Sequence, residues 1–232
     1  MTIQTHPPSQ LPAKRARRKQ ARPGELLAAA LDLFVEKGFA ATRVEEVAQR
    51  AGVSKGTLFL YFSSKEELFK AVVRQSLSAR FFEWSAEVDD YTGSSADLLR
   101  HGMLSWWERV GNTLASGMTK LMLTEAHNFP EMAAFYQTEV ALPYQGLVRR
   151  ILQRGMDSGE FAPVDPDLAT YSVTAPLIFL SMWKHSMGNH PCAPAALDPQ
   201  QYLASQLHIL LNGLCVRPAM DALPLSPPKI KP

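Results

Sequence analysis

Side chains that can bind a polyanion gather between Lys55 and Tyr61 of this 232-residue chain. Lys55 carries a positive charge, Thr57 a hydroxyl and a methyl group, and Tyr61 a phenol hydroxyl one helical turn later. Ammonium and hydroxyl groups donate to phosphate oxygens, Lys also donates to guanine O6 or N7, and a methyl group can contact thymine. Gly56 leaves out a side chain where two backbones must approach closely. The residue types and spacing therefore favour a contact with DNA.

The residues before this segment predict two short helices joined by a tight turn. Thr42 and Glu45 have the spacing of a capping box, and an apolar face at helical spacing follows them. Gly52 suits a left-handed turn, and Ser54 has the type and place of a helix cap. We expect three apolar side chains of the second helix to point back to the core: Leu58, Phe59 and Phe62. This order indicates a helix-turn-helix over residues 44–63.

The flanking residues predict two further helices around this motif. Pro23 suits the first turn of a helix that runs to Lys37, and Gly38 suits its end. Downstream, Ser64 and Glu67 form a second predicted capping box. It would start a fourth helix that reaches about Val88 and joins the motif to the rest of the chain.

The run GFAATRVEEVAQRAGVSKGTLFLYFSSKEELF (residues 38–69) resembles the DNA-binding domain of the tetracycline-repressor (TetR/AcrR) family of bacterial regulators. The resemblance covers roughly residues 22–80 and is specific in order and spacing, whereas beyond it only LTEAHNFPEMAAFY (residues 123–136) is similar to segments of such regulators. It implies DNA contacts for a set of residues at the helix ends: Thr42, Arg43, Lys55, Gly56, Thr57, Tyr61 and Lys65. Ser54 belongs to the same candidate surface, although it is a cap whatever else it does.

Several of these residues also have a purely structural interpretation. Thr42 is a cap first and a phosphate ligand second, and the ring of Tyr61 could be half buried in the core. Arg43 is the candidate for base reading from the first helix, and free N–H groups at the helix ends would favour phosphate beside Thr42 and Lys65. Many relatives carry Tyr where this chain has Leu60, which removes one polar contact that the resemblance implies.

A basic run precedes the first helix, and the residues in it that we expect to meet DNA are Lys14, Arg15, Arg17, Arg18 and Lys19. Basic runs are commonly solvated arms, but this one could enter the minor groove beside the recognised site. The net charge of +2 is uneven, because residues 1–84 hold 14 Lys or Arg against 8 Asp or Glu, and the rest hold 10 against 14. A basic N-terminal third again favours a polyanion.

The fold expected from these patterns is all-α, with about nine helices and no hairpin signal. Hydrophobic residues make up 46% of the chain, enough for a sizeable core. We expect four parts: a basic arm that is disordered alone (1–20), the DNA-binding domain (21–81), a helical regulatory and dimerisation domain (82–215) and a mobile Pro-rich tail (216–232). Pro143 is expected to kink a long helix from Pro130 to about Ser158, and Asp165 and Asp198 to cap the last two helices.

Aromatic and methionine side chains are dense between residues 96 and 190. For any one of them core packing is the simpler explanation, but together they could line an apolar small-molecule pocket, which the resemblance also implies. The candidates for ligand binding are Trp106, Met122, Tyr136, Phe179 and Trp183. Three further side chains, Arg109, Glu125 and His127, could orient a polar ligand or be exposed.

The two last helices carry more apolar surface than one contact needs, which predicts a homodimer. The candidate interface residues are Val173, Leu177, Leu180, Leu203, Leu207 and Leu210. Burial of both helices within one subunit is the alternative. The resemblance implies a four-helix interface, and twofold symmetry would then require a palindromic DNA site.

Motifs of catalysis and metal binding are missing from the sequence, so we expect no enzyme, cofactor or metal. His190 and Cys192 form only an isolated H-x-C. The cysteines Cys192 and Cys215 indicate reduced thiols, and the N-terminus has no signal-peptide core, which favours a cytoplasmic protein. The expected function is a dimeric repressor released from DNA by a small, largely apolar ligand. The alternative is a DNA-binding activator or architectural factor without ligand control.

Overall fold

The computed structural model describes residues 12–188, 190 and 197–215, and the side chains from residue 23 onward within these ranges. Its described part is helical, with one isolated bridge between Phe161 and Cys215 in place of any sheet. When helices that continue through a π-turn are counted once, the described chain has the nine helices expected. None of the described helices is long and apolar enough to cross a membrane.

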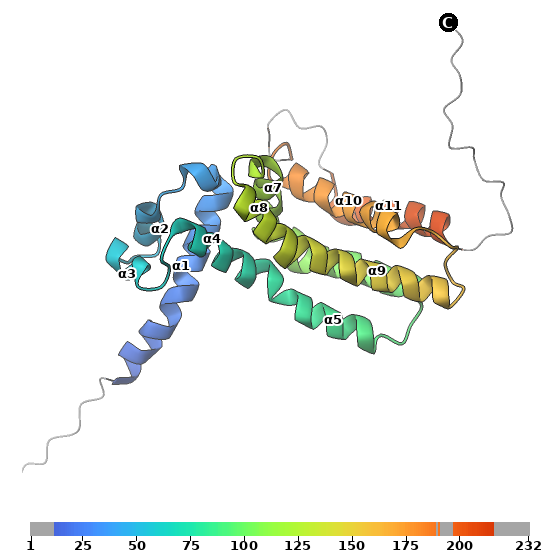
Figure 1. Ribbon diagram of the computed structural model, residues 1–232, viewed down its shortest axis with the longest axis horizontal. Helices are drawn as coiled ribbons and strands as arrows, with labels where there is room; N and C mark the ends of the chain where they lie inside the picture. Colours follow the sequence, from blue (N-terminus) through green and yellow to red (C-terminus); the bar gives the residue numbers. More distant parts are fainter. Residues whose placement is uncertain (1–11, 189, 191–196, 216–232) are drawn as a thin grey trace, which may run out of the picture.

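The N-terminal part consists of a long helix and three short ones: α1 (Pro12–Ala41), α2 (Val44–Arg50), α3 (Lys55–Phe59) and α4 (Lys65–Val73). Figure 1 shows them at one end of an elongated molecule, with α2 and α3 outermost. Helix α1 continues upstream through Pro23 and the basic run, where an irregular arm was expected. Gly38 interrupts it with a φ of 84°, a conformation that glycine adopts at little cost.

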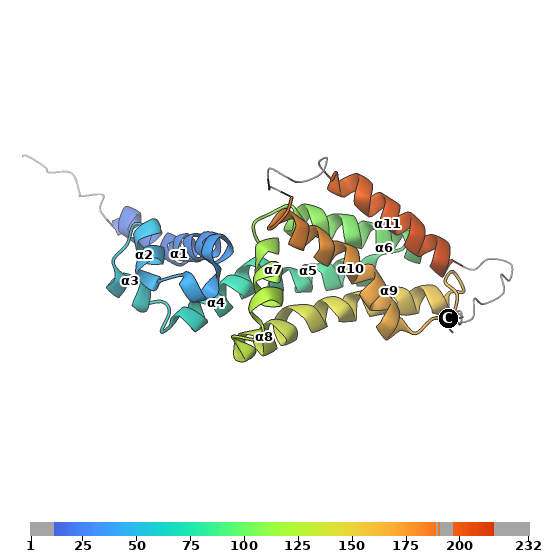
Figure 2. The ribbon, with the colours of Figure 1, turned by 90° about the horizontal axis from the view of Figure 1, so that it is seen from above.

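The regulatory part begins where α4 continues through a π-turn, η1 (Arg74–Ser78), into α5 (Arg80–Asp90). The segments that follow are α6 (Ser95–Trp106), η2 (Trp107–Gly111), α7 (Ser116–Glu125), α8 (Pro130–Tyr136), η3 (Gln137–Ala141) and α9 (Leu142–Asp157). The last two helices are α10 (Pro166–Lys184) and α11 (Pro199–Leu214). They lie side by side along one edge of the bundle (Figures 1 and 2). The break in the helix expected from Pro130 to Ser158 is η3, just before Pro143.

Four predicted caps are present. The side-chain oxygens of Ser54 and Ser64 accept the N–H groups of Thr57 and Glu67, and those of Asp165 and Asp198 each accept two N–H groups. Gly159 ends α9 with a φ of 73°. Such caps satisfy N–H groups that the helices leave free.

Two clusters of buried apolar side chains hold the molecule together. The first joins α1–α4 to α7, α8 and the η segments, so the DNA-binding part and the adjoining regulatory helices share one core. At its centre the rings of Phe34, Phe39 and Phe69 lie 5.6 Å apart, and Phe129 meets Phe39 edge-on at 4.9 Å. The second cluster joins α6, α9, α10 and α11. The expected boundary at residues 81/82 falls inside α5.

Candidate nucleic-acid interface and ligand cavity

The first turn of α3 is the exposed end of the helix-turn-helix. Ser54 Oγ accepts the backbone N–H of Thr57 at 3.1 Å and lies 2.9 Å from Thr57 Oγ1. Ser54, Lys55 and Gly56 are exposed and Thr57 is half-buried, while Leu58 behind them is fully buried. Gly52 makes the turn with a φ of 68°. The structure thus places the N-terminal turn of α3 at the surface, where such a motif contacts base edges.

Lys55 is held beside α2 by an ion pair. Its Nζ lies 2.6 Å from Glu45 Oε1, and both side chains are more than half exposed. The hydrogen bond from Lys55, together with its charge, lowers the pKa of Glu45. An exposed pair of this kind contributes little to stability because water and salt screen it. The Lys55 ammonium group can therefore exchange Glu45 for a phosphate or a base edge at small cost.

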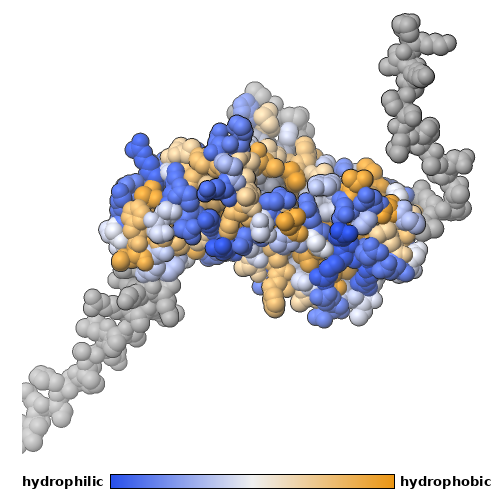
Figure 3. All heavy atoms as spheres, in the orientation of Figure 1, coloured by the Kyte–Doolittle hydropathy of each residue, from blue (hydrophilic) through white to orange (hydrophobic). Residues whose placement is uncertain are grey.

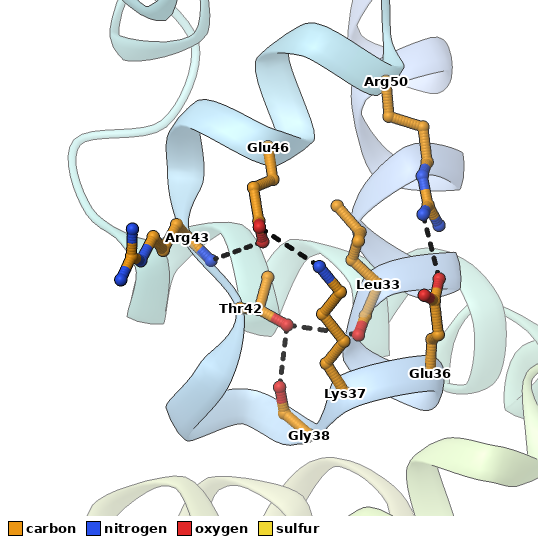
Figure 4. Close-up of polar contacts among 8 residues, drawn as sticks. All are labelled: Leu33, Glu36, Lys37, Gly38, Thr42, Arg43, Glu46 and Arg50. Carbon is orange, nitrogen blue, oxygen red and sulfur yellow. Dashed lines mark hydrogen bonds and ion pairs between the residues drawn. The ribbon is translucent and has the colours of Figure 1, made fainter.

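Two ion pairs join α2 to α1 behind the exposed surface (Figure 4). Lys37 binds Glu46 at 3.1 Å, and Arg50 binds Glu36 at 2.9 Å. The Arg43 side chain points away from this group and is exposed (Figure 4). Its position before the first turn of α2 leaves its guanidinium group available to a polyanion.

The expectation that Thr42 caps α2 and binds phosphate is wrong for its side chain. Arg43 is the residue at the cap position, and Glu46 accepts the Arg43 backbone N–H at 3.5 Å. Thr42 is 1% exposed, and its hydroxyl faces the carbonyl oxygens of Gly38 at 2.7 Å and Leu33 at 3.1 Å. The turn at Gly38 brings the hydroxyl back onto carbonyl groups of α1, so it closes that turn instead of facing DNA (Figure 4).

Lys65 also has an internal role that the sequence did not indicate. Its Nζ donates to the carbonyl oxygens of Phe39, Ala40 and Thr42 at 2.8, 3.3 and 3.1 Å and lies 4.3 Å from the centre of the Phe39 ring. The ammonium group neutralises carbonyls at the end of α1, where a positive charge is favourable. Lys65 therefore joins α4 to the α1–α2 turn, and its ammonium group is hydrogen-bonded to the carbonyl groups of that turn.

The apolar residues after Lys55 divide between the core and the surface. Phe62 and Tyr61 are half-buried and pack against the first core cluster. Phe59 is 42% exposed and Leu60 82% exposed, so the expected inward orientation of Phe59 is wrong. Apolar surface is visible over this end of the molecule in Figure 3. Leu58 and Phe59 are consecutive residues of α3 and point about 100° apart, so they cannot both face the core.

A cavity of about 340 Å³ lies behind the DNA-binding part, among α5–α10 and the η segments. This volume is in the range of small-molecule sites. Three of the predicted ligand residues line it, namely Trp106, Met122 and Tyr136. Lining residues that the sequence interpretation missed are Leu77, Phe81 and Trp84. The spacing of these three, at 77, 81 and 84, is a helical stripe that could have revealed them.

The cavity wall is apolar with a few neutral polar groups. No described residue that lines it carries a formal charge; its polar side chains include Thr119, Tyr136, Gln137, Tyr144, Gln145 and Thr174. The hydroxyls of Thr119 and Tyr136 are hydrogen-bonded at 2.8 Å. Burial raises the pKa of Tyr136 to about 12 and raises the pKa of Tyr144 as well, so both phenols keep their protons at neutral pH.

Two predicted ligand residues lie elsewhere. Phe179 is 43% exposed, its ring 6.1 Å from that of Trp183 and 5.3 Å from that of Tyr202 on α11. Neither Phe179 nor Trp183 lines the cavity, because α10 turns Tyr171, Thr174 and Ile178 toward it. The three polar candidates are also outside its lining: Arg109 pairs with Glu87 at 2.6 Å, His127 is exposed, and Glu125 lies beside Gly38.

All three π-turns of the described chain contribute to the cavity wall. Leu77 comes from η1, Val110 from η2, and Gln137, Val140 and Ala141 from η3. Extra residues of this kind interrupt a helix locally and are frequent at functional sites. Here they mark the places where long helices bend around the cavity.

The predicted dimer contacts are internal contacts of the chain. Exposure is at most 3% for Val173, Leu177, Leu180, Leu203 and Leu207, and Leu210 is partly buried against the same cluster. These side chains form the core between α10, α11 and their neighbours, so the alternative of burial within one subunit is correct for them. Other side chains of α10 and α11 point outward, among them Leu168, Phe179 and Ile209.

Some sequence expectations fall outside the residues that can be tested. The side chains of the basic run are not described, and residues 1–11, Cys192 and the Pro-rich tail lie outside the described residues. Among described residues no group of three or more His, Cys, Asp or Glu side chains could hold a metal ion.

Comparison with known proteins relates the chain to bacterial transcriptional regulators. The family model described as "Bacterial regulatory proteins, tetR family" matches residues 26–72. The uncharacterised regulator YfiR of Bacillus subtilis is 34% identical over 154 residues, which are 66% of this chain and 73% of YfiR. The transcriptional repressor KstR2 of Mycobacterium tuberculosis is 28% identical over 198 residues, 84% of this chain and 93% of KstR2.

Among solved structures, FadR from Bacillus subtilis in complex with stearoyl-CoA has the same fold. Its TM-score is 0.60 at 19% identity, and the match covers 82% of this chain and 98% of FadR. The likeness extends well beyond the helix-turn-helix, so the arrangement of the regulatory helices is shared as well.

Proposed function

Since the chain belongs to the tetR family of bacterial regulatory proteins and is a DNA-binding transcriptional regulator, we propose that it is a dimeric repressor released from a palindromic operator by a small, largely apolar ligand. The observation that carries this proposal is the position of the cavity. The continuous helix α4–η1–α5 has one end in the core of the DNA-binding part and the other in the cavity wall. We place the protein in the cytoplasm, where its DNA target lies.

Helix α7 supplies a second route between cavity and DNA. Thr119 and Met122 line the cavity, while Gly117 faces α1, where a Cβ on it would lie 2.6 Å from Val35 Cγ1. The α7 backbone at Gly117 packs directly on the Val35 side chain, so α7 and α1 cannot shift independently, because packed side chains have few alternative arrangements. A ligand that favours another position of α7 or α5 would therefore move α1, α2 and α3 as well. Its difference in affinity for the two conformations sets how far it shifts the equilibrium between them.

The relatives support repression and control by a ligand. KstR2 is named a repressor, and FadR of B. subtilis was solved with stearoyl-CoA. FasR of Mycolicibacterium smegmatis, named an activator, matches only 57 residues, 25% of this chain. Because the match covers most of KstR2, repression is better supported than activation.

The outward faces of α10 and α11 are the proposed dimer interface. Leu168, Phe179 and Ile209 are 43–67% exposed. Apolar surface is visible over this edge in Figure 3. Large neighbouring apolar side chains on a soluble surface favour association. Two copies joined here would present two α3 helices to successive major grooves of an inverted repeat.

The basic run at the start of α1 is proposed to add phosphate contacts. Each phosphate that it neutralises adds about 0.9 to the slope of log affinity against log salt concentration. Replacing Lys14, Arg15, Arg17, Arg18 and Lys19 with Gln should lower this slope, and an unchanged slope would remove the run from the interface.

Neighbouring alanines on α8 allow a matched test of ligand control. Ala133 lines the cavity, whereas Ala134 is exposed on the same helix. Ala133→Phe fills part of the cavity as a ligand would, and we expect it to weaken binding to upstream DNA by about tenfold, a typical coupling between two sites. Ala134→Phe should leave this affinity unchanged. Fluorescence anisotropy on folded proteins measures both, and equal affinities would contradict ligand control by this cavity.

A further inference from the structure

Trp84 is a buried hydrogen-bond donor without an acceptor in the wall of the cavity. Its side chain is 8% exposed, and no described residue accepts a hydrogen bond from Nε1. The Trp84 ring meets the Phe81 ring edge-on, at 5.5 Å between ring centres. A buried polar group without a partner costs about 1–3 kcal/mol, so an occupant that supplied an acceptor would gain this energy.

Tyr144 is a second neutral donor in the same wall. It lines the 340 Å³ cavity together with Trp84, and both residues also border a smaller cavity of about 50 Å³. No hydrogen bond of its hydroxyl is present among the described residues, and burial alone raises its pKa, so the phenol stays protonated. By contrast, the Tyr136 hydroxyl on the same cavity is already bonded to Thr119.

The absence of charged side chains from the described wall also restricts which ligands the cavity can bind. Because no described lining residue is charged, a carboxylate, phosphate or ammonium group would lose its hydration without a counter-ion. An uncharged oxygen loses much less hydration free energy on entering the cavity, and a hydrogen-bond donor of the wall takes the place of the water that it loses. The lining is otherwise hydrocarbon and aromatic, which suits an alkyl or alicyclic body.

We propose that the effector is an uncharged, largely hydrocarbon molecule with a hydrogen-bond-accepting oxygen, such as a ketone, and that Trp84 Nε1–H and the Tyr144 hydroxyl donate to this oxygen. This assignment rests on the proposed ligand control of the cavity and specifies its ligand class. Trp84 and Tyr144 are then the residues that set specificity, while Leu77, Met122 and Val140 supply apolar contact.

Three twelve-carbon probes of equal chain length test the assignment: 2-dodecanone, dodecane and dodecanoate at pH 8. Displacement of an environment-sensitive dye gives their affinities for the full-length protein. We expect 2-dodecanone to bind about 100-fold more tightly than dodecane, since each of the two satisfied donors corresponds to roughly a factor of ten. It should exceed dodecanoate by more than about 100-fold, because the carboxylate has no counter-ion in the wall. Dodecanoate binding as tightly as the ketone, or no binding of the ketone, would overturn the assignment.

Trp84→Phe keeps an aromatic ring and removes the N–H. It should lower 2-dodecanone affinity about tenfold and leave dodecane affinity within about twofold, so that the alkane corrects for the change in volume. Trp183→Phe, a half-buried indole outside the cavity, should change neither affinity. Tyr144→Phe provides the same test if Trp84→Phe does not fold. An unchanged ratio of ketone to alkane affinity in both cavity variants would contradict the two donors.

DNA binding by the same proteins separates this inference from the proposed function. If 2-dodecanone binds with the expected ratios but does not release upstream DNA, the cavity chemistry stands and ligand control fails. If dodecanoate alone binds and releases DNA, ligand control stands and the neutral ligand is excluded.

Discussion

Lys55 is the side chain that we propose to carry base and phosphate contact most directly. Its ion pair with Glu45 lies at the surface and contributes little to folding. We expect Lys55→Met to lower affinity for specific DNA at least about tenfold, in line with the roughly 1–3 kcal/mol of a direct contact, without changing the melting temperature. Fluorescence anisotropy against specific and random duplexes measures the effect.

The matched control for Lys55 is Arg100, which forms an exposed ion pair with Asp97 on α6. Arg100→Met removes the same charge far along the chain from α3 and should leave DNA affinity nearly unchanged. Equal losses for both variants would mean that net charge, and not the α3 turn, determines binding.

At the candidate DNA surface, the sequence predicted local helix capping better than it predicted the orientation of side chains. Ser54 was predicted as a cap because capping depends on local spacing alone. Thr42 was misjudged because the reversal at Gly38 returns its hydroxyl to α1, a contact between residues nine positions apart. The internal contacts of Lys65 were not expected for the same reason, since its carbonyl acceptors lie more than twenty residues upstream.

At the scale of elements, helix existence followed from apolar periodicity, whereas helix continuity did not. The sequence predicted one helix from Lys65 to about Val88, and the structure inserts η1 within it. A π-turn adds a residue without any required residue type, so periodicity over a short window does not detect it. The cavity was correctly expected in the regulatory part, but Trp84 was missed because that stretch was interpreted only as a linker.

The junction of α7 and α10 should make folding sensitive to acid. His185 Nε2 lies 2.8 Å from the buried Ser116 Oγ, and burial, with smaller effects of the Lys184 and Lys120 charges, lowers the His185 pKa from 6.5 to about 4. The stability that depends on neutral His185 is therefore complete above pH 6.5 and is lost as pH falls from 6.5 to about 4.

Comparison with His185→Gln isolates this contribution from other titrating groups. Wild-type protein should lose on the order of 1 kcal/mol more than the variant between pH 7 and 4.5, a value reduced because water reaches part of the ring. Urea unfolding at several pH values provides the measurement, and parallel stability curves would exclude His185 as the titrating group.

At the scale of the whole molecule, dimer formation depends on which apolar faces of α10 and α11 are exposed, and the sequence alone could not separate these from the buried faces. Two apolar faces on one helix look alike whether the partner belongs to the same chain or to another copy, and the predicted set from Val173 to Leu210 is internal. The exposed Ile209, at 61%, now marks the proposed interface. We expect Ile209→Asp to yield monomers in sedimentation analysis and to weaken binding to inverted repeats.

Phe82 on α5, 86% exposed, is the control for this prediction. Phe82→Asp makes the same kind of change outside α10 and α11 and should leave the dimer intact. Dissociation by Phe82→Asp alone would move the interface to α5.

The most direct measurement of the central claim is a footprint of the full-length protein on the DNA upstream of its gene. Two copies that each present the first turn of α3 should protect two half-sites of an inverted repeat, with centres about 10 base pairs or a multiple apart, and Lys55→Met should abolish the protection. Protection that is absent or uniform along the duplex, from a protein that sediments as a monomer, would contradict it.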